Sequence, residues 1–180
     1  METILRVDNM ILDFIQTHIR NPILDTIMPI ITSLGNGSIL WIAIGIFLIA
    51  NKNYRKYGYM IIISLCLCLI IGNLGLKPLV ARARPFNANN ALDLLLISPP
   101  KDFSFPSGHT MTSFAAATVI FYMNKKFGVL AIILSILIAF SRLYLYVHYP
   151  SDVFVGMLSG IIIGFISIKM YCFYSRKKSI

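Results

Sequence analysis

The residues best suited to chemistry lie in three short clusters between positions 77 and 152, and most of the sequence between them is apolar. The clusters are Lys77-Pro-Leu-Val-Ala-Arg-Ala-Arg84-Pro85, then Pro106-Ser107-Gly108-His109, then Ser141-Arg142 with His148 and Asp152. Charged side chains are costly near a bilayer, so in an apolar chain they indicate a functional site. These residue types suit one task, which is to hold a phosphate group with cations and attack it with an imidazole.

Five of these residues predict a phosphate-binding site. Transfer of a phosphoryl group needs positive charge around its oxygens, an in-line nucleophile and an acid for the leaving oxygen. Lys77, Arg84 and Arg142 can supply the charge, and the arginine fork matches phosphate oxygens. Ser107 and Gly108 begin a predicted helix, whose free amides and dipole bind anions. The Ser107 hydroxyl can add a hydrogen bond or cap the helix, and Gly108 lets the backbone approach the phosphate closely.

The nucleophile is predicted from a histidine and a carboxylate four residues apart across a turn. A carboxylate on one ring nitrogen fixes the tautomer and makes the other nitrogen more nucleophilic. We therefore expect His148 to form a phosphohistidine, with Asp152 as its partner. His109 is left to protonate the leaving oxygen and then to activate water. This scheme requires no metal and no cofactor, and the only other acids between the clusters are Asp93 and Asp102.

Each residue taken singly has a structural alternative. Lys77 could be an interfacial lysine that reaches toward water, and Asp152 could simply favour the dipole of the helix it opens. Arg82 and Lys101 are expected to contact lipid headgroups or to be solvated. Tyr144, Tyr146 and Tyr149 are expected to form an interfacial aromatic belt. These structural alternatives, taken independently, do not explain why every residue type that a phosphate site needs is predicted on one membrane face.

The composition is that of an integral membrane protein. The 180 residues are 57% hydrophobic and 13% charged, with a mean hydropathy of +0.77, whereas soluble domains are roughly 25% charged. The apolar runs lack the alternation of a barrel, so the expected fold class is all-α, a bundle of five to six transmembrane helices in a single domain over residues 1–180. Nucleic-acid binding is excluded because no basic, aromatic-interleaved soluble segment is present. We expect no cleavable signal peptide, and Cys66, Cys68 and Cys172 are expected to be small buried hydrophobes rather than a disulfide or metal framework.

The order of segments along the chain predicts where the clusters lie. Residues 1–20 have the pattern of an amphipathic helix, either in the membrane interface or packed on the bundle. Residues 22–50 are cut by Gly35-Asn36-Gly37-Ser38, so they form two short helices joined by a turn or one broken pass, and we favour two helices. A catalytic core over residues 57–173 follows. Its expected parts are a span ending at Lys77, a long loop over 81–106 and helices over 107–123, 127–146 and 150–173.

This order places all three clusters on one membrane face. Cytoplasmic loops are enriched in Lys and Arg. The cations expected on the opposite face are Lys52, Arg55, Lys56, Lys125, Lys126, Lys169, Arg176, Lys177 and Lys178, against Lys77, Arg82, Arg84, Lys101 and Arg142 on the cluster face. The site is therefore expected on the extracytoplasmic side of a multi-pass protein of the cell membrane.

The three clusters resemble the three signatures of the type 2 phosphatidic acid phosphatase family. Lys77 with Arg84-Pro85 is similar to the first, Pro106–His109 to the second, and Ser141-Arg142 with His148 and Asp152 to the third. The resemblance implies an α-helical core and a metal-independent phosphatase that forms a phosphohistidine. It assigns the nucleophile to His148, its partner to Asp152 and the general acid to His109. It assigns phosphate binding to Lys77, Arg84, Ser107, Gly108 and Arg142.

The expected function is hydrolysis of a phosphate from a membrane lipid. Small bacterial members of this family resemble undecaprenyl-diphosphate phosphatases, and an external site suits the recycling of a polyprenyl diphosphate for the cell wall. Phosphatidylglycerophosphate, phosphatidate and lipid A are alternative substrates. A phosphotransferase, or a non-catalytic lipid-binding or transport protein, is an alternative activity. The expected partners are the lipid phosphate substrate and membrane lipids, and the sequence leaves the oligomeric state open.

Overall fold

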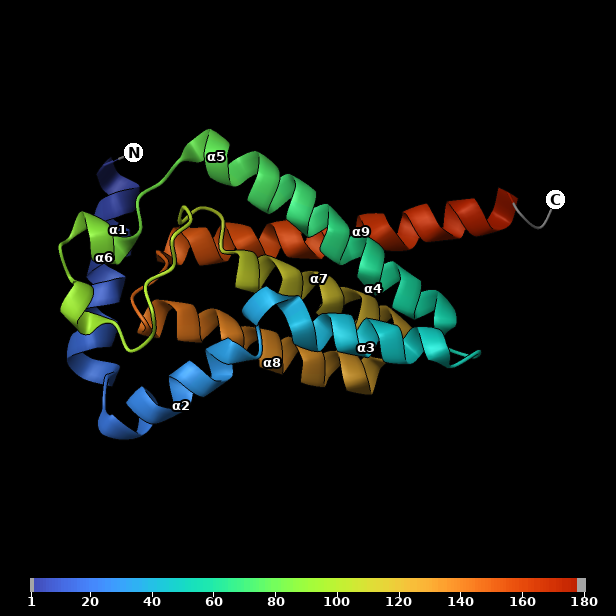
Figure 1. Ribbon diagram of the computed structural model, residues 1–180, viewed down its shortest axis with the longest axis horizontal. Coiled ribbons are helices and arrows are strands. Elements are labelled where there is room, and N and C mark those ends of the chain that lie inside the picture. The colour runs from blue at the N-terminus through green and yellow to red at the C-terminus, as the bar shows by residue number, and fades with distance from the viewer. Residues whose placement is uncertain (1, 178–180) are drawn as a thin grey trace.

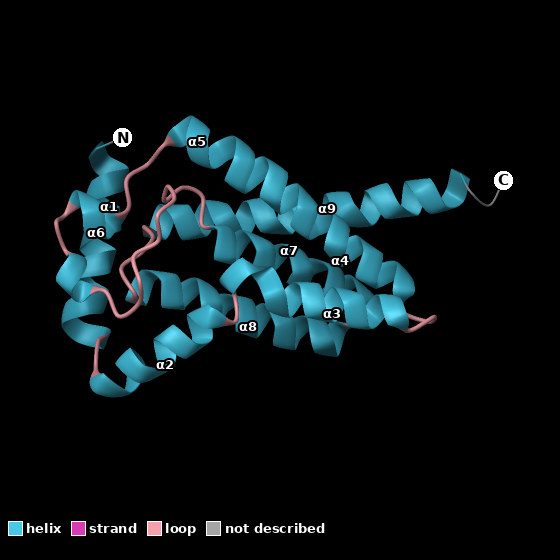
Figure 2. Cartoon of the chain, in the orientation of Figure 1, coloured by secondary structure: helices cyan, strands magenta, loops and turns pink. Residues whose placement is uncertain are grey.

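The structure, a computed structural model, describes residues 2–177, and every regular element in that range is helical (Figure 2). The helices that form the bundle are α2 (Pro22–Ser33), α3 (Ile39–Ala50), α4 (Arg55–Cys68), α7 (Gly108–Met123), α8 (Lys125–Tyr144) and α9 (Pro150–Lys177). Three further helices, α1 (Glu2–Phe14), α5 (Lys77–Val80) and α6 (Pro85–Ala88), lie at one end of this bundle (Figure 1). Short π- and 3-10 segments occupy Ile15–Ile19, Asn36–Ser38, Leu69–Leu76 and Leu92–Leu94. The all-helical prediction is confirmed.

Within residues 2–177, up to four segments of the bundle are long and apolar enough to be membrane passes, and α7 packs among them. α8, α9 and the stretch that begins with α4 are each long and apolar enough to cross a membrane. α2 and α3 meet the same criterion as a pair, and they run in the same direction with a bend of 43° between them (Figure 1). α7 has only 16 residues but packs along α8 and α9. The two helices favoured for residues 22–50 therefore exist, and they form a bent pair that is long and apolar enough, taken together, for one pass.

The outside of the bundle is apolar along these passes. Exposed side chains include Ile46, Phe47, Leu130, Ile133, Ile162 and Phe165. An apolar surface of this extent would aggregate in water. In lipid, an α-helix suits such a surface because all its backbone hydrogen bonds are made within the helix. The protein is therefore a membrane protein whose bundle surface faces the acyl chains.

A row of glycines on α9 sets the distance between α9 and the central helix α7. A Cβ at Gly160 would lie 2.3 Å from the Met111 carbonyl oxygen, and one at Gly156 would lie 2.8 Å from the Ser107 carbonyl oxygen. One turn further on, a Cβ at Gly164 would lie 2.7 Å from Thr118. Small residues four apart are the usual device for close packing of helices in membranes. This approach brings the first turns of α7 and α9 together, and both carry predicted site residues.

The amphipathic helix predicted over residues 1–20 is present as α1, which lies crosswise to the long helices at the end where α5 and α6 gather (Figure 1). Asp8 and Leu12 are buried against the bundle. The neighbouring stripe of the helix is apolar and exposed, and it consists of Ile4, Val7, Ile11 and Phe14. The helix thus packs on the bundle through one stripe and presents the next one, a hydrophobic stripe suited to a membrane interface.

The aromatic belt expected from three tyrosines is a wrong prediction. Tyr144, Tyr146 and Tyr149 are buried in a core cluster at the site end of the bundle. α1 and the loop over residues 81–106 cover them, and this cover could not be seen in the local pattern. Their polar ends are also engaged: Tyr144 donates to Asp25 Oδ1 (2.7 Å) and Tyr146 accepts from Asn89 Nδ2 (2.8 Å). Of the three cysteines, only Cys68 is buried as expected, while Cys172 is half-buried and Cys66 is exposed.

Acidic and basic residues are distributed unequally between the two ends of the bundle. All seven acids of the chain lie at the end that carries α1, namely Glu2, Asp8, Asp13, Asp25, Asp93, Asp102 and Asp152. The turns and termini at the other end carry Lys52, Arg55, Lys56, Lys125, Lys126, Arg176 and Lys177. Lys178, expected with this group, lies outside the described residues.

Candidate active site

The three predicted clusters meet at the α1 end of the bundle. Their residues come from six places: the first residue of α5, the residue before α6, the start of α7, the last turn of α8, the turn after α8 and the first turn of α9. They surround a cavity of about 630 Å³, whose lining includes Lys77, Arg84, Gly108, His109, Arg142 and His148. Ser107 and Asp152 are fully buried behind this wall. The structure therefore brings together all eight residues predicted for the site.

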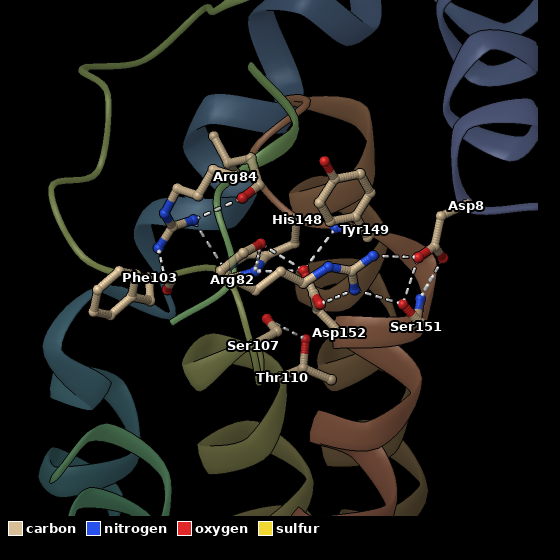
Figure 3. A network of polar contacts seen from close by, with 12 residues as sticks. Asp8, Arg82, Arg84, Phe103, Ser107, Thr110, His148, Tyr149, Ser151 and Asp152 are labelled. Atoms are coloured by element: carbon tan, nitrogen blue, oxygen red, sulfur yellow. Dashed lines mark hydrogen bonds and ion pairs between the residues drawn. The ribbon is translucent and has the colours of Figure 1, made fainter. Parts of the chain in front are cut away.

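His148 occupies a buried turn between α8 and α9, and its two ring nitrogens have different surroundings (Figure 3). Nδ1 lies 3.7 Å from Asp152 Oδ2 and 3.5 Å from the Ser104 hydroxyl. Nε2 lies 3.2 Å from Arg84 Nη1. The Asp152 distance is longer than a hydrogen bond, as is common for catalytic pairs without substrate. This arrangement leaves Nε2 as the nitrogen that faces the cations.

The charge state of His148 follows from the same surroundings. Burial lowers the pKa of the imidazole well below its ordinary value, and the positive charges of Arg84, Arg142 and Lys77 lower it further, against a smaller opposing effect of Asp102. Both causes disfavour a charged ring. The imidazole is therefore neutral near pH 7, which is the form that can act as a nucleophile.

Asp152 is fully buried and is held on both oxygens (Figure 3). Oδ2 accepts from the Ser104 hydroxyl (2.5 Å) and from the Tyr149 backbone amide (2.9 Å), while Oδ1 accepts from Arg82 Nη1 (2.5 Å). The bond to the Tyr149 amide closes the N-terminus of α9, in the manner of a capping box. The structural role and the proposed catalytic role of this carboxylate thus coexist in one side chain.

Lys77 and Arg84 converge on a carboxylate that sequence reasoning did not select. Arg84 Nη2 donates to Asp102 Oδ1 (2.6 Å), and the Lys77 ammonium pairs with Asp102 Oδ2. Burial opposes the charged carboxylate, but the hydrogen bonds and charges of Lys77 and Arg84 prevail and hold the pKa of Asp102 below its ordinary value. Both cations are buried whereas the Asp102 side chain is 53% exposed. Two anionic oxygens therefore already occupy the place between these cations where we expect phosphate oxygens.

The break between α2 and α3 explains the position of His109. Nε2 of His109 lies 2.9 Å from Asn36 Oδ1, and a Cβ at Gly35 would lie 2.6 Å from His109 Cδ2. The bend between α2 and α3 therefore delivers an amide that orients the imidazole and a glycine that leaves it room. The Gly35–Ser38 segment was visible in the sequence, but nothing in it pointed to a histidine seventy residues away.

Arg142 is buried with one guanidinium nitrogen unsatisfied. Its Nη1 donates to Thr32 Oγ1 of α2 (2.6 Å). Its Nε is the one buried side-chain polar atom without a hydrogen-bond partner in the part of the chain that the structure describes. Such groups are rare in folded proteins and call for an explanation. Arg142 also lines the cavity, so its charge can attract an anion there.

Ser107 and Gly108 form the entry to α7. The Ser107 amide donates to the Asp152 carbonyl (3.1 Å), and its hydroxyl pairs with Thr110 Oγ1 (2.9 Å) rather than capping the helix. A Cβ at Gly108 would lie 3.3 Å from Asn73 Oδ1 and 3.9 Å from Lys77 Nζ. The backbone at Gly108 is thus within reach of whatever Lys77 binds.

Comparison with known proteins identifies this arrangement. The sequence profile of the PAP2 superfamily matches residues 53–176, which include all eight residues. The chain belongs to the PAP2 superfamily. An undecaprenyl-diphosphatase of Sulfolobus acidocaldarius is 36% identical over 132 residues, which are 73% of this chain and 63% of that protein. The undecaprenyl-diphosphatase BcrC of Bacillus subtilis is 34% identical over 146 residues, covering 81% of this chain and 74% of that protein.

A solved structure shares the PAP2 fold. The crystal structure of Aquifex aeolicus LpxE superposes with a TM-score of 0.75 at 32% identity, covering 92% of this chain and 94% of that one. Other relatives are named lipid A 4′-phosphatase and phosphatidylglycerophosphatase B. The resemblance seen in the three motifs is therefore confirmed at the level of the superfamily, while the relatives' names differ in substrate.

A second cavity, of about 460 Å³, adjoins the PAP2 site. It shares Lys77, Asp102, Gly108 and His109 with the first cavity. Much of the rest of its lining is apolar and comes from α3, α4 and the π-helical segment after α4, including Ile42, Ile62, Leu65, Cys66 and Leu69. The polar site thus opens sideways into a hydrophobic groove between membrane-spanning helices.

Residues outside the predicted set also contact the site, and four of them were not expected there. Asn36, Asp102 and Ser104 touch His109, Arg84 and His148 as described above. Arg82, expected to contact lipid headgroups or to be solvated, instead bonds Asp152, so that expectation is wrong. Lys101 is exposed, and its contact with headgroups stays a prediction. One feature of the sequence indicated further carboxylates. The predicted site had three cations but a single acid, so additional acids near the cations could have been expected.

Proposed function

We propose that this protein is a PAP2-type lipid phosphatase that releases phosphate from a membrane lipid through a phosphohistidine at His148. The observation that carries the proposal is the position of a buried imidazole whose Nε2 lies 3.2 Å from Arg84, in the wall of a cavity also lined by Lys77 and Arg142. The charge of Arg142, which also lines the cavity, supports an anion there. A cavity that only bound lipid would need the cations but not the His148–Asp152 pair.

The proposed reaction has two steps. In the first, His148 Nε2 attacks phosphorus, the bond from phosphorus to the lipid oxygen breaks, and His109 gives that oxygen its proton. In the second, His109 takes a proton from water, the resulting hydroxide attacks the phosphohistidine, and the nitrogen–phosphorus bond breaks to release inorganic phosphate. Asp152 stabilises the positive charge that develops on the His148 ring. Lys77, Arg84, Arg142 and the start of α7 stabilise charge on the phosphoryl oxygens.

We propose that the reaction is metal-independent, because three buried cations can supply the charge stabilisation that a metal would give. Lys77, Arg84 and Arg142 all line the cavity. Phosphate release is therefore expected to continue at full rate in EDTA. Loss of activity in EDTA with recovery on addition of a divalent cation would contradict this part of the proposal.

We propose undecaprenyl diphosphate as the substrate. The apolar groove supports a lipid with a long chain, because it extends from the polar cavity between α3 and α4 to the lipid-facing surface. Two relatives of this chain, 36% and 34% identical to it, are named undecaprenyl-diphosphatases. The second phosphate of a diphosphate would remain on the lipid product, with Lys77 and the Gly108 backbone at the boundary of the two cavities.

We propose that the site faces the extracytoplasmic side of the cell membrane. At the site end, Arg82, Arg84 and Lys77 are paired with carboxylates and Arg142 is buried. The lysines and arginines of the opposite end make no ion pair within residues 2–177, and such a cluster of cations is typical of a cytoplasmic surface. A reporter fused after Lys126 is expected to be cytoplasmic and one inserted after Ala91 external. An external reporter after Lys126 would overturn this orientation.

The test of function is phosphate release by detergent-purified protein from a panel of pure lipids. The panel contains undecaprenyl diphosphate, phosphatidylglycerophosphate, phosphatidate and lipid A. We expect kcat/KM for undecaprenyl diphosphate to exceed the others by at least about tenfold, which is a difference of about 1.4 kcal/mol in transition-state binding. His148→Ala should abolish release, while His18→Ala, at an exposed histidine of the Ile15–Ile19 segment, should not change it. Release from no lipid would contradict the function, and preference for another lipid would contradict only the substrate.

A further inference from the structure

Arg82 connects the buried carboxylate of the catalytic pair to a second carboxylate from the other end of the chain. Its Nη1 donates to Asp152 Oδ1 (2.5 Å) and to the Ser151 hydroxyl (2.7 Å), while Nη2 donates to Asp8 Oδ2 (2.7 Å). The guanidinium also lies over the Tyr149 ring, 3.9 Å from its centroid. Figure 3 shows Arg82 between the two carboxylates. The side chain is therefore fixed along its edge and on its face.

Asp8 reaches this network from α1. It is buried, and besides Arg82 it accepts from the Ser151 amide (2.9 Å) and the Ser151 hydroxyl (2.6 Å). The hydrogen bond from the Ser151 amide satisfies a backbone N–H of the first turn of α9 that has no partner within the helix. Ser151 is next to Asp152, the residue that faces His148. No other residue of α1 makes an ion pair within the described part of the chain. One carboxylate thus carries the polar contact between the N-terminal helix and the site.

We propose that α1 is a positioning element of the active site, in which Asp8 acts through Arg82 to hold the Asp152 carboxylate in the orientation that serves His148. This inference rests on the proposed function. Asp8 touches neither substrate nor His148, so it is a positioning residue rather than a catalytic one.

The charges explain why a second carboxylate is needed. Asp152 Oδ2 faces His148 and Oδ1 faces Arg82, so Arg82 competes with the His148 ring for one negative charge. If Asp152 were the only acid bound to Arg82, the guanidinium would attract the Asp152 carboxylate away from the His148 ring. Asp8 draws the opposite edge of the guanidinium toward α1 and satisfies its charge there. Burial opposes the charged guanidinium, but the hydrogen bonds and charges of Asp8 and Asp152 together raise the pKa of Arg82 above its ordinary value.

A purely structural role for Asp8 predicts different behaviour from a positioning role. Asp8→Asn keeps an oxygen that can accept from the Ser151 amide, so it preserves the contact that docks α1 while removing the charge that faces Arg82. Asp8→Glu keeps the charge. Asp13→Asn is the matched control, because Asp13 is an exposed acid on the same helix.

The experiment measures kcat and KM for phosphate release from undecaprenyl diphosphate by the full-length variants in detergent. Asp8→Asn is expected to lower kcat by about tenfold and Arg82→Gln by about 10- to 100-fold, the range found for residues that orient catalytic ligands, with KM changed less than about threefold. Asp8→Glu should recover most of the loss and Asp13→Asn should match the wild type. The double variant should be no slower than Arg82→Gln alone, because Asp8 acts through Arg82.

Several outcomes would overturn the proposal. They are a kcat for Asp8→Asn within twofold of the wild type, a rise in KM alone, or losses that add in the double variant. Size-exclusion and thermal unfolding profiles report the folded fraction, and a loss of activity that disappears when kcat is expressed per folded molecule also counts against it. Activity of the wild type and its loss in His148→Ala test the proposed function separately, on the same substrate.

Discussion

At the scale of single residues, the protonation state of His148 decides whether it can act as a nucleophile. Burial and the charges of Arg84, Arg142 and Lys77 lower the pKa of this imidazole, and the charge of Asp102 opposes them. A lowered pKa means that the neutral, nucleophilic ring persists as the pH falls through the ordinary histidine value of about 6.5. Protonation, and loss of the nucleophile, should occur only at lower pH.

An NMR titration of histidine-labelled protein checks this prediction. The His148 resonance, assigned by its absence from His148→Ala, should still report a neutral ring at pH 6. A ring that is half protonated at pH 7 would contradict the prediction that burial and the nearby cations lower the pKa of His148.

The carboxylate of Asp102 makes a second prediction at this scale. It binds the two cations expected to bind phosphate, so it competes with an incoming anion. Asp102→Asn should tighten inhibition by inorganic phosphate by about three- to tenfold, a modest effect because the side chain is half exposed. The inhibition constant is measured with the same lipid substrate, and Asp93→Asn, in the same loop but outside the cavity lining, is the control. Weaker phosphate inhibition would mean that Asp102 orients the cations rather than competing for them.

At the scale of elements, the break between α2 and α3 is part of the site. Gly35 packs on the His109 ring and Asn36 bonds its Nε2. An added methyl group at Gly35 would lie 2.6 Å from the ring, so the ring must move away from its position. Gly35→Ala should lower kcat by about tenfold or more, the cost of displacing a catalytic group by a fraction of an ångström.

Gly75→Ala is the control for this variant, because its added Cβ has no contact closer than 3.3 Å. Phosphate-release kinetics of the two variants should differ clearly. Equal activity of Gly35→Ala and the wild type would indicate that His109 tolerates a shift, and thus that it is not the proton donor in the reaction.

The same scale shows what the sequence could predict. The helices of the core and the convergence of Lys77, His109 and His148 follow from apolar segment lengths and from the parity of crossings. The contacts of Asp8 and Asn36 do not, because each joins segments tens of residues apart with no periodic spacing. The burial of the three tyrosines could not be predicted for the same reason, since the segments that cover them come from the N-terminus and from an irregular loop.

At the scale of the whole molecule, the bundle joins a polar cavity at one end to an apolar groove along its side. A lipid can keep its chain in the membrane while its phosphate enters the site. Cys66 lies in the groove and is exposed, so a larger side chain there would obstruct the groove without disturbing the core. Cys66→Trp should raise KM for undecaprenyl diphosphate by about tenfold and leave KM for a short-chain prenyl diphosphate within about twofold, since one bulky group removes one to two kcal/mol of chain contacts.

Leu130→Trp, at an exposed position of α8 outside the groove, controls for the added indole. The comparison of long and short chains separates obstruction of the groove from damage to the site. An equal rise in KM for both substrates would place the lipid chain elsewhere.

The account depends most on covalent attack by His148. The direct measurement is acid-free quenching of the wild-type protein during turnover of undecaprenyl diphosphate labelled with ³²P in its terminal phosphate, followed by peptide mapping. The account predicts an acid-labile, base-stable phosphoryl group on His148 that is absent from His148→Ala and persists longer in a variant with an impaired His109. Full phosphate release by His148→Ala, or label on any other residue, would contradict it.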